Sequence, residues 1–261
     1  MIKFFRKIRQ NLIMENKTSK YFKYAIGEII LVVIGILIAL QINNWNKQRK
    51  DNKLEAEYYC RLLEDIEQDK QQINQLKLFA DNRLKASNEA LRLLQQESPN
   101  SIDVGKQNSL AIKAIYFDFK PNNTAFEDLK SGAKLSVIKD KDIIKSLNIY
   151  YNNIETLKSI IIVNGKRAVD ISFAHEDRFA NGHTQASIEY GRFKEGMDKD
   201  VLKNISTDTI PLLTKSMHKR LYNEALVYIS TNTRQIELLN YLIDYTSSMS
   251  MLLQNKCVST D

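Results

Sequence analysis

Hydrophobic and polar positions divide the chain into one uninterrupted apolar run and several long stretches with helical periodicity. The run from Tyr24 to Ile42 holds 19 residues with a single charge, Glu28, and leaves no polar face. A helix of that length rises about 28 Å, which matches the hydrocarbon thickness of a bilayer. The polar residues after Leu40 lack the small-residue pattern of an export cleavage site. The sequence therefore predicts a membrane-spanning helix over 24–45, rather than a cleaved signal or a buried core helix.

The flanks of this run predict its orientation. Seven lysines and arginines precede it, and four follow within a comparable distance. Because cationic loops remain on the cytoplasmic side, we expect residues 1–23 to form a cytoplasmic, basic, amphipathic leader. Residues 46–261 then form an extracytoplasmic domain, which is periplasmic if the source has two membranes. Small residues share one side of the span and predict close packing against a second helix; they are Gly27, Gly35 and Ala39.

The stretches beyond the run predict an all-α fold. The first covers about 46–96 and continues the span without a break, the second begins at a cap formed by Asp140 or Asp142, and the third covers about 212–254. In the second stretch, apolar residues alternate in steps of four and three, the a/d seam of a coiled coil. These residues are Ile143, Leu147, Tyr150, Ile154, Leu157 and Ile161. We therefore predict an N-terminal transmembrane helix that continues into an extracytoplasmic antiparallel helical bundle or coiled coil.

Shorter segments lie between these stretches. NTAFEDLKSG, residues 123–132, has the cap, acids and terminal glycine of a short helix, whereas AKLSVI, residues 133–138, suits an extended segment. Residues 182–210 show no sustained periodicity and predict an irregular excursion. An acidic group on the first long stretch has the spacing of a solvated helix face; it comprises Glu64, Asp65, Glu67 and Asp69.

Two blocks of the sequence resemble a known family. FRKIRQNLIMENKTSKYFKYAIGEIILVVIGILIALQINNWN and PNNTAFEDLKSGAKLSVIKDKDIIKSLNIYYNNIE are similar to an uncharacterised family of bacterial inner-membrane proteins, a domain of unknown function. The resemblance implies an N-terminal anchor in the inner membrane and a helical extracytoplasmic region. It implies no catalytic residues, because the family has no established activity.

The charge distribution and the motifs of the chain limit the classes of function that we expect. The net charge is +7, but residues 1–50 carry a balance of +8 and the rest a balance of −1, so the helical domain offers no general field for nucleic acid. Nucleotide-binding and hydrolase motifs of the G-x-x-x-x-G-K-[ST] and G-x-S-x-G types do not occur. We expect no cofactor, and we expect a protein without enzymatic activity rather than an enzyme.

Some residues still suggest ligand chemistry. His175, Glu176, Asp177 and His183 would place two imidazoles and two carboxylates together if the chain turned sharply at Asn181 and Gly182. An ordinary polar role at a helix end, on the seam that passes through Ile171, explains His175 better, and we predict no metal site. If residues 182–210 formed a small-ligand or enzyme site, its candidate side chains would be Arg178, His183, Tyr190 and Arg192. We therefore predict first a membrane-anchored helical module that binds the lipid bilayer and a protein partner or a second copy of itself, as a scaffold or sensor. A ligand site at 182–210 is the alternative.

The two cysteines, Cys60 and Cys257, permit a disulfide on an oxidising side of the membrane. If the three long helices simply alternated in direction, the last would run outward like the first. Cys257 at its end would then lie far from Cys60. That arrangement favours two unpaired thiols.

Overall fold

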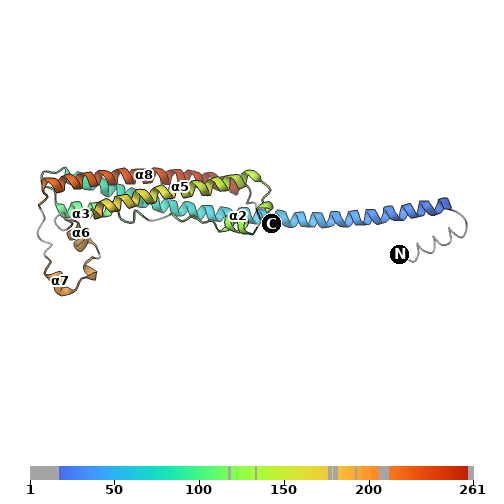
Figure 1. Ribbon diagram of the computed structural model, residues 1–261, viewed down its shortest axis with the longest axis horizontal. Coiled ribbons are helices and arrows are strands. Elements are labelled where there is room, and N and C mark those ends of the chain that lie inside the picture. The colour runs from blue at the N-terminus through green and yellow to red at the C-terminus, as the bar shows by residue number, and fades with distance from the viewer. Residues whose placement is uncertain are drawn as a thin grey trace. The chain divides into compact units, whose positions relative to one another are not determined.

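The computed structural model describes residues 18–116, 119–132, 134–175, 178, 182–191, 193–205 and 212–257. Every regular element in these ranges is a helix (Figure 1). The described residues up to Glu57 form one compact unit, and those from Tyr58 onward form a second, which we call the helical domain. The prediction of an all-α chain is confirmed for the described residues.

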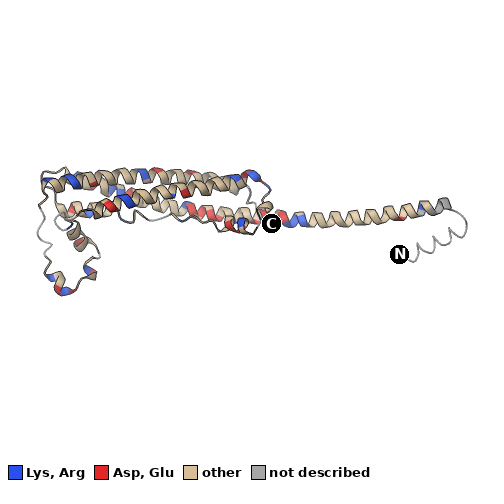
Figure 2. Cartoon of the chain, in the orientation of Figure 1, with Lys and Arg blue, Asp and Glu red and all other residues tan. Residues whose placement is uncertain are grey.

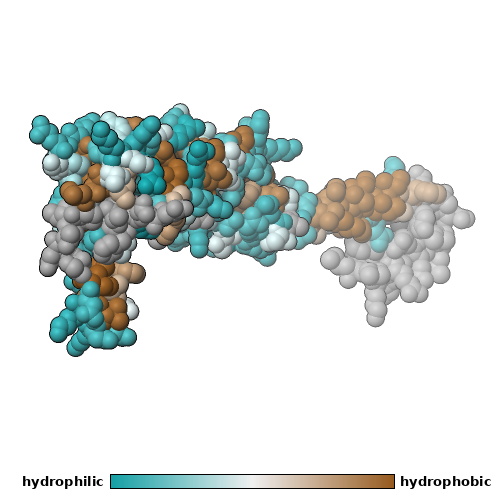
Figure 3. Space-filling model, turned by 60° about the vertical axis from the view of Figure 1, so that its left-hand side comes forward, coloured by the Kyte–Doolittle hydropathy of each residue, from teal (hydrophilic) through white to brown (hydrophobic). Residues whose placement is uncertain are grey.

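Helix α2, Thr18–Leu94, contains both the apolar run and the first long helix of the helical domain. Large aliphatic side chains between Ile26 and Ile42 are exposed on all sides of this helix. They form the hydrophobic surface of the apolar segment in Figure 3, and Figure 2 shows how few charges interrupt them. This helix is therefore long and apolar enough to span a membrane, and the expected continuity of the span with the first long stretch is confirmed.

The helical domain is built on three long helices. They are the later part of α2, α5 (Lys141–Phe173) and α8 (Lys215–Gln254), which lie side by side in Figure 1. Shorter elements connect them: α3 (Ser101–Ala111), α4 (Thr124–Ser131), the 3₁₀ helix η1 (Leu135–Val137), α6 (His183–Tyr190), the 3₁₀ helix η2 (Phe193–Gly196) and α7 (Lys199–Lys203).

Contacts along the helices show their directions. The Tyr150 hydroxyl donates to Asp69 over 2.9 Å, and further along both helices Ala86 and Ala168 share one core cluster, so α5 runs parallel to α2. Helix α8 runs antiparallel to both, because the His218 ring lies 2.6 Å from the Leu94 carbonyl oxygen while Ser250 bonds Glu67. The chain returns along α2 through α3 and through residues 112–116 and 119–123, which are not α-helical, and this leaves α5 to run outward again. The expected simple alternation is therefore wrong.

This order of helices brings the two cysteines together. Cys60 and Cys257 form a disulfide, with their Cα atoms 4.8 Å apart and 197 positions apart in sequence. The preference for unpaired thiols is wrong because the return path is made by α3 and the segment after it, so α8 comes back to the start of the helical domain. Lys256 also pairs with Asp140 there, at 3.1 Å.

Two of the four acids predicted to form a solvated face of α2, Asp65 and Asp69, instead bind a distant segment of the chain, whereas Glu64 is exposed as expected. Asp69 is fully buried, and its carboxylate accepts from the Asn122 backbone N–H (2.7 Å) and the Tyr150 hydroxyl. Asp65 accepts from the Ala125 N–H at 2.9 Å and so caps α4, whose own N-cap residue Asn123 makes no side-chain cap bond. The solvated-face interpretation is wrong for Asp69, because the carboxylates satisfy backbone donors of a segment more than fifty residues away.

Other local predictions had mixed outcomes. Asp140 caps α5 through hydrogen bonds from the Asp142 and Ile143 N–H groups, and five of the six seam residues are buried, Leu157 being half-buried. The short helix in 123–132 is confirmed as α4. Residues 135–137 form a 3₁₀ helix, so the extended segment is wrong there. The described part of 182–210 contains α6, η2 and α7 and is therefore more regular than expected.

Burial of Asp69 generates a pH prediction. Burial raises the pKa of Asp69 from 3.8 to about 6, against the lowering effect of its hydrogen bonds. The folded state therefore binds a proton more tightly than the unfolded state, and this residue makes stability fall as pH rises from about 4 through 6. The unfolding free energy of Asp69→Asn minus that of the parent protein should therefore be about 2–3 kcal/mol more positive at pH 7 than at pH 3.5.

Urea unfolding followed by far-UV circular dichroism at both pH values measures this difference. Asp81→Asn, which changes a half-buried carboxylate on the same helix, is the control. If the difference in unfolding free energy between Asp69→Asn and the parent protein were the same at both pH values, the raised pKa of Asp69 would be contradicted.

Candidate functional site

The structure brings two of the residues predicted from sequence together. His175 follows the C-terminal end of α5 and His183 is the first residue of α6; both are buried, with ring centroids 6.0 Å apart. Glu176, Asp177 and Arg192 lie outside the described residues. The carboxylate that joins the two histidines comes from Glu224 of α8.

The position of His183 depends on a close approach of α3 and α6. Gly182, just before α6, has a φ of +82°, and a Cβ on it would lie 2.0 Å from the Ser101 carbonyl oxygen. A Cβ on Gly105 of α3 would likewise lie 2.6 Å from the Gly182 carbonyl. Only glycine fits at both positions, because the two backbones are in contact and the first also needs the left-handed conformation. This contact fixes the start of α6 beside α8.

Glu224 is the centre of a buried polar group that we call the Glu224 centre, made of Glu224, His175, His183 and Tyr228. The Nε2 atom of His175 lies 2.7 Å from Oε2 of Glu224, and Nε2 of His183 lies 3.7 Å from Oε1. The Tyr228 hydroxyl donates to Oε1. Burial alone would raise the pKa of Glu224, but the interactions of its carboxylate with the two imidazoles and the Tyr228 hydroxyl outweigh burial and lower the pKa to about 2. The carboxylate is therefore charged at neutral pH.

This charge affects its neighbours. Burial and the Glu224 charge raise the pKa of Tyr228, so its phenol stays protonated and acts as a donor. Arg178 donates to the Ser172 carbonyl oxygen over 2.6 Å at the end of α5. The centre thus joins the end of α5 to α8 through the His175–Glu224 pair at 2.7 Å, whereas His183, at the start of α6, lies 3.7 Å from the same carboxylate, beyond hydrogen-bond distance.

The other predicted residues are not assembled around an open site. Tyr190 is the last residue of α6, at the opposite end from His183, and its half-exposed ring has the Lys106 ammonium 3.8 Å from its centroid. Within the described ranges, no group of three or more His, Cys, Asp or Glu side chains is arranged to hold a metal ion. The ligand site suggested for 182–210 stays a prediction.

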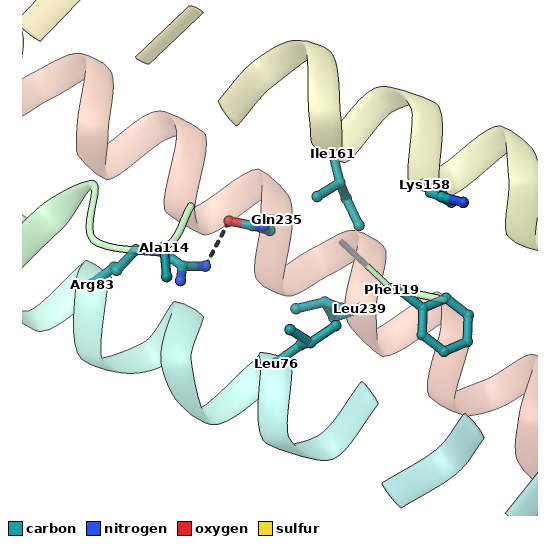
Figure 4. Close-up of a pocket in the computed structure, with 8 residues that line it drawn as sticks. All are labelled: Leu76, Arg83, Ala114, Phe119, Lys158, Ile161, Gln235 and Leu239. Atoms are coloured by element: carbon teal, nitrogen blue, oxygen red, sulfur yellow. Dashed lines mark hydrogen bonds between the residues drawn. The ribbon is translucent and has the colours of Figure 1, made fainter. Parts of the chain in front are cut away.

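A second buried polar network surrounds the turn after α3. Arg83 of α2 donates through Nε to Asn232 (3.0 Å), through Nη2 to Gln235 (2.8 Å) and through Nη1 to the Lys113 carbonyl (3.4 Å). Asn232 also donates to the Ala111 carbonyl at 3.0 Å. These side chains satisfy carbonyl groups that the end of α3 leaves without helical partners. Figure 4 shows Arg83 and Gln235 joined beside a small cavity of about 10 Å³.

A larger hollow also has Arg83 in its lining. It is a groove of about 700 Å³ between α2 and α3, which we call the α2–α3 groove. Its lining combines apolar, amide and charged side chains; the residues are Phe79, Asn82, Arg83, Lys85, Ala86, Glu89, Gln107, Leu110, Lys113 and Ala114. Ala114 has a φ of +53°, a left-handed conformation that is strained for a residue with a Cβ. The groove wall is thus built on a turn held in place by the Arg83 network.

The partners in these two networks could not be identified from the sequence. Glu224 lies 49 positions from His175 and 41 from His183, and Arg83 lies 149 positions from Asn232. None of these spacings matches a local motif. The one available hint is that both residues fall at positions where helical periodicity expects an apolar side chain.

The Glu224 centre predicts a defined pH dependence. Because the pKa of Glu224 is lower in the folded than in the unfolded state, its contribution to stability is present above about pH 4.5 and is lost as pH falls toward 2. Glu224→Gln should therefore lower the unfolding free energy by about 3 kcal/mol at pH 7, and by less at pH 3. Glu237→Gln, on the exposed face of the same helix, should change it by about 0.5 kcal/mol or less. Equal effects of the two substitutions in urea unfolding would contradict this role.

Comparison with known proteins gives one match. Residues 28–166 match a family model described as a family of unknown function, DUF6090. No curated protein and no solved structure matches the chain. The matched range includes the apolar segment of α2, helix α4 and most of α5. The chain therefore belongs to this family of unknown function.

Proposed function

We propose that this chain is a single-span protein of the bacterial inner membrane whose helical domain lies outside the cytoplasm and binds a protein partner. In this proposal, residues 24–45 cross the bilayer, residues 1–23 remain in the cytoplasm, and residues 46–261 are extracytoplasmic. The observation that carries it is the presence, in one helix, of a fully exposed apolar segment and of a cysteine in a disulfide.

The disulfide supports the proposed location of the helical domain outside the cytoplasm. Disulfides persist in oxidising compartments and are rare where cytoplasmic reductants act. Cys60 is in α2, 18 positions beyond Ile42, and Cys257 follows α8. A covalent bond between these residues therefore favours an oxidising location for the whole helical domain. The excess of cations before the span favours the same orientation independently.

A second groove supports binding of a protein partner. It has a volume of about 180 Å³ and lies between α5 and α8; its lining includes Ile149, Tyr245 and Met249. Ile149 is 49% exposed and Tyr245 is 40% exposed, and Tyr241 and Met251 of α8 are also exposed. Aromatic rings and methionine are enriched at protein interfaces. An apolar helix from a partner, or from a second copy of this chain, fits a surface of this chemistry.

The span itself has room for a helix partner. A Cβ on Gly27 or Gly35 would meet no atom within 4 Å, so nothing packs against α2 at these two glycines. Small residues at this spacing permit close approach of two helices in lipid. The charge balance of −1 beyond residue 50 argues against a nucleic-acid partner.

The location can be tested by protease accessibility. Protease added outside spheroplasts should digest the helical domain after the disulfide is reduced, because the proposal places the domain outside the cytoplasm. A cytoplasmic protein is the control for intact spheroplasts. If the full chain survived protease treatment of spheroplasts but was digested in inverted vesicles from the same cells, the helical domain would have the opposite orientation.

Binding at the α5–α8 groove can be tested by photo-crosslinking in cells. A benzophenone amino acid in place of Tyr245 should yield one discrete adduct, because this ring lines the groove. The same amino acid in place of Arg234, which is exposed on the same helix but is not among the groove residues, is the matched control. Equal adducts from both positions, or none from Tyr245, would contradict a partner site there.

A further inference from the structure

The α2–α3 groove carries an excess of unpaired positive charge. Three cations line it, Arg83, Lys85 and Lys113, whereas Glu89 is its one acidic residue. Glu89 pairs with Arg92, which does not line the groove. Within the described part of the chain, neither Lys85 nor Lys113 forms an ion pair, so the groove has a net positive field.

Arg83 is the buried member of this group. Its side chain is 4% exposed, and its partners, Asn232, Gln235 and the Lys113 carbonyl, are all neutral oxygens. Burial lowers the pKa of Arg83 to about 10, so the guanidinium is still charged at neutral pH. A buried cation without a carboxylate partner is costly, and an anion in the adjacent groove would offset that cost.

The remainder of the groove is apolar. Phe79 and Leu110 are 46% and 38% exposed on opposite walls, and Ala86 and Ala114 have side chains too small to fill the space between them. The volume of about 700 Å³ lies within the range of small-ligand pockets. Cations beside an apolar surface match a molecule with an anionic head and an aliphatic body.

We propose that the α2–α3 groove binds an amphiphilic carboxylate, whose head group lies against Arg83, Lys85 and Lys113 and whose aliphatic chain lies against Phe79, Ala86 and Leu110. This site is distinct from the α5–α8 groove and from residues 182–210. It does not depend on which side of the membrane holds the helical domain.

The proposal is tested by calorimetric titration of the full chain, reconstituted in phosphatidylcholine nanodiscs, with octanoate at pH 7.5 and low salt. Empty nanodiscs provide the baseline for partition into lipid. Octanamide has the same chain without the charge and is the matched ligand. We expect octanoate to bind at least about tenfold more tightly than octanamide, since this ratio corresponds to about 1.4 kcal/mol of charge recognition.

Two variants separate the parts of the site. Lys85→Met with Lys113→Met removes two exposed cations and should weaken octanoate binding about tenfold while leaving octanamide unchanged. Lys145→Met with Lys166→Met removes the same charge from exposed positions on α5 and should have no effect. Leu110→Trp should fill the groove and abolish binding of both ligands, whereas Leu226→Trp, at a similarly exposed leucine of α8, should not.

Three results would overturn the proposal. They are the absence of octanoate binding beyond the empty-nanodisc baseline, equal affinity for octanoate and octanamide, and binding that survives Leu110→Trp in a protein whose circular dichroism matches the parent. Because the Lys and Leu110 positions are exposed, their substitution tests the site without removing the buried Arg83 network.

Discussion

The fold depends on the need to satisfy the backbone polar groups of a non-helical segment packed against three helices. Residues 112–116 and 119–123 return along α2 outside any α-helix, so most of their N–H and carbonyl groups need partners other than a helical ladder. Arg83, Asn232 and Gln235 supply partners around the turn after α3, and Asp69 supplies them at Asn122. These side chains come from α2 and α8, and they fix the segment between those helices.

This return path determines the order of the helices. Because the chain is back at the start of the helical domain before α5 begins, α5 runs parallel to α2 and α8 runs antiparallel to both. Each end of the domain is then closed by a long-range link. The Cys60–Cys257 disulfide closes one end, and the Glu224 centre joins α5, α6 and α8 toward the other. In the entropy model, a cross-link of this span stabilises the fold by about 5 kcal/mol.

The sequence predicted those features that local chemistry determines. The cap at Asp140, the seam of α5, the short helix α4 and the apolar segment of α2 all follow from residues within a few turns of one another. It did not predict features that depend on distant partners. Asp69 has the spacing of a solvated acid, and only the docking of Asn122 and Tyr150 explains its burial. Likewise the paired histidines were visible in the sequence, but Glu224, which joins them, was not.

The Cys60–Cys257 disulfide depends on the helix order and on an oxidising location together, so its state in native membranes bears on both. Protein purified from native membranes would be alkylated without reduction, digested, and analysed by mass spectrometry. We expect a single linked pair of peptides, one containing Cys60 and the other containing Cys257, which separates only after reduction. Alkylated thiols at both positions, or a link from either cysteine to a different chain, would contradict it.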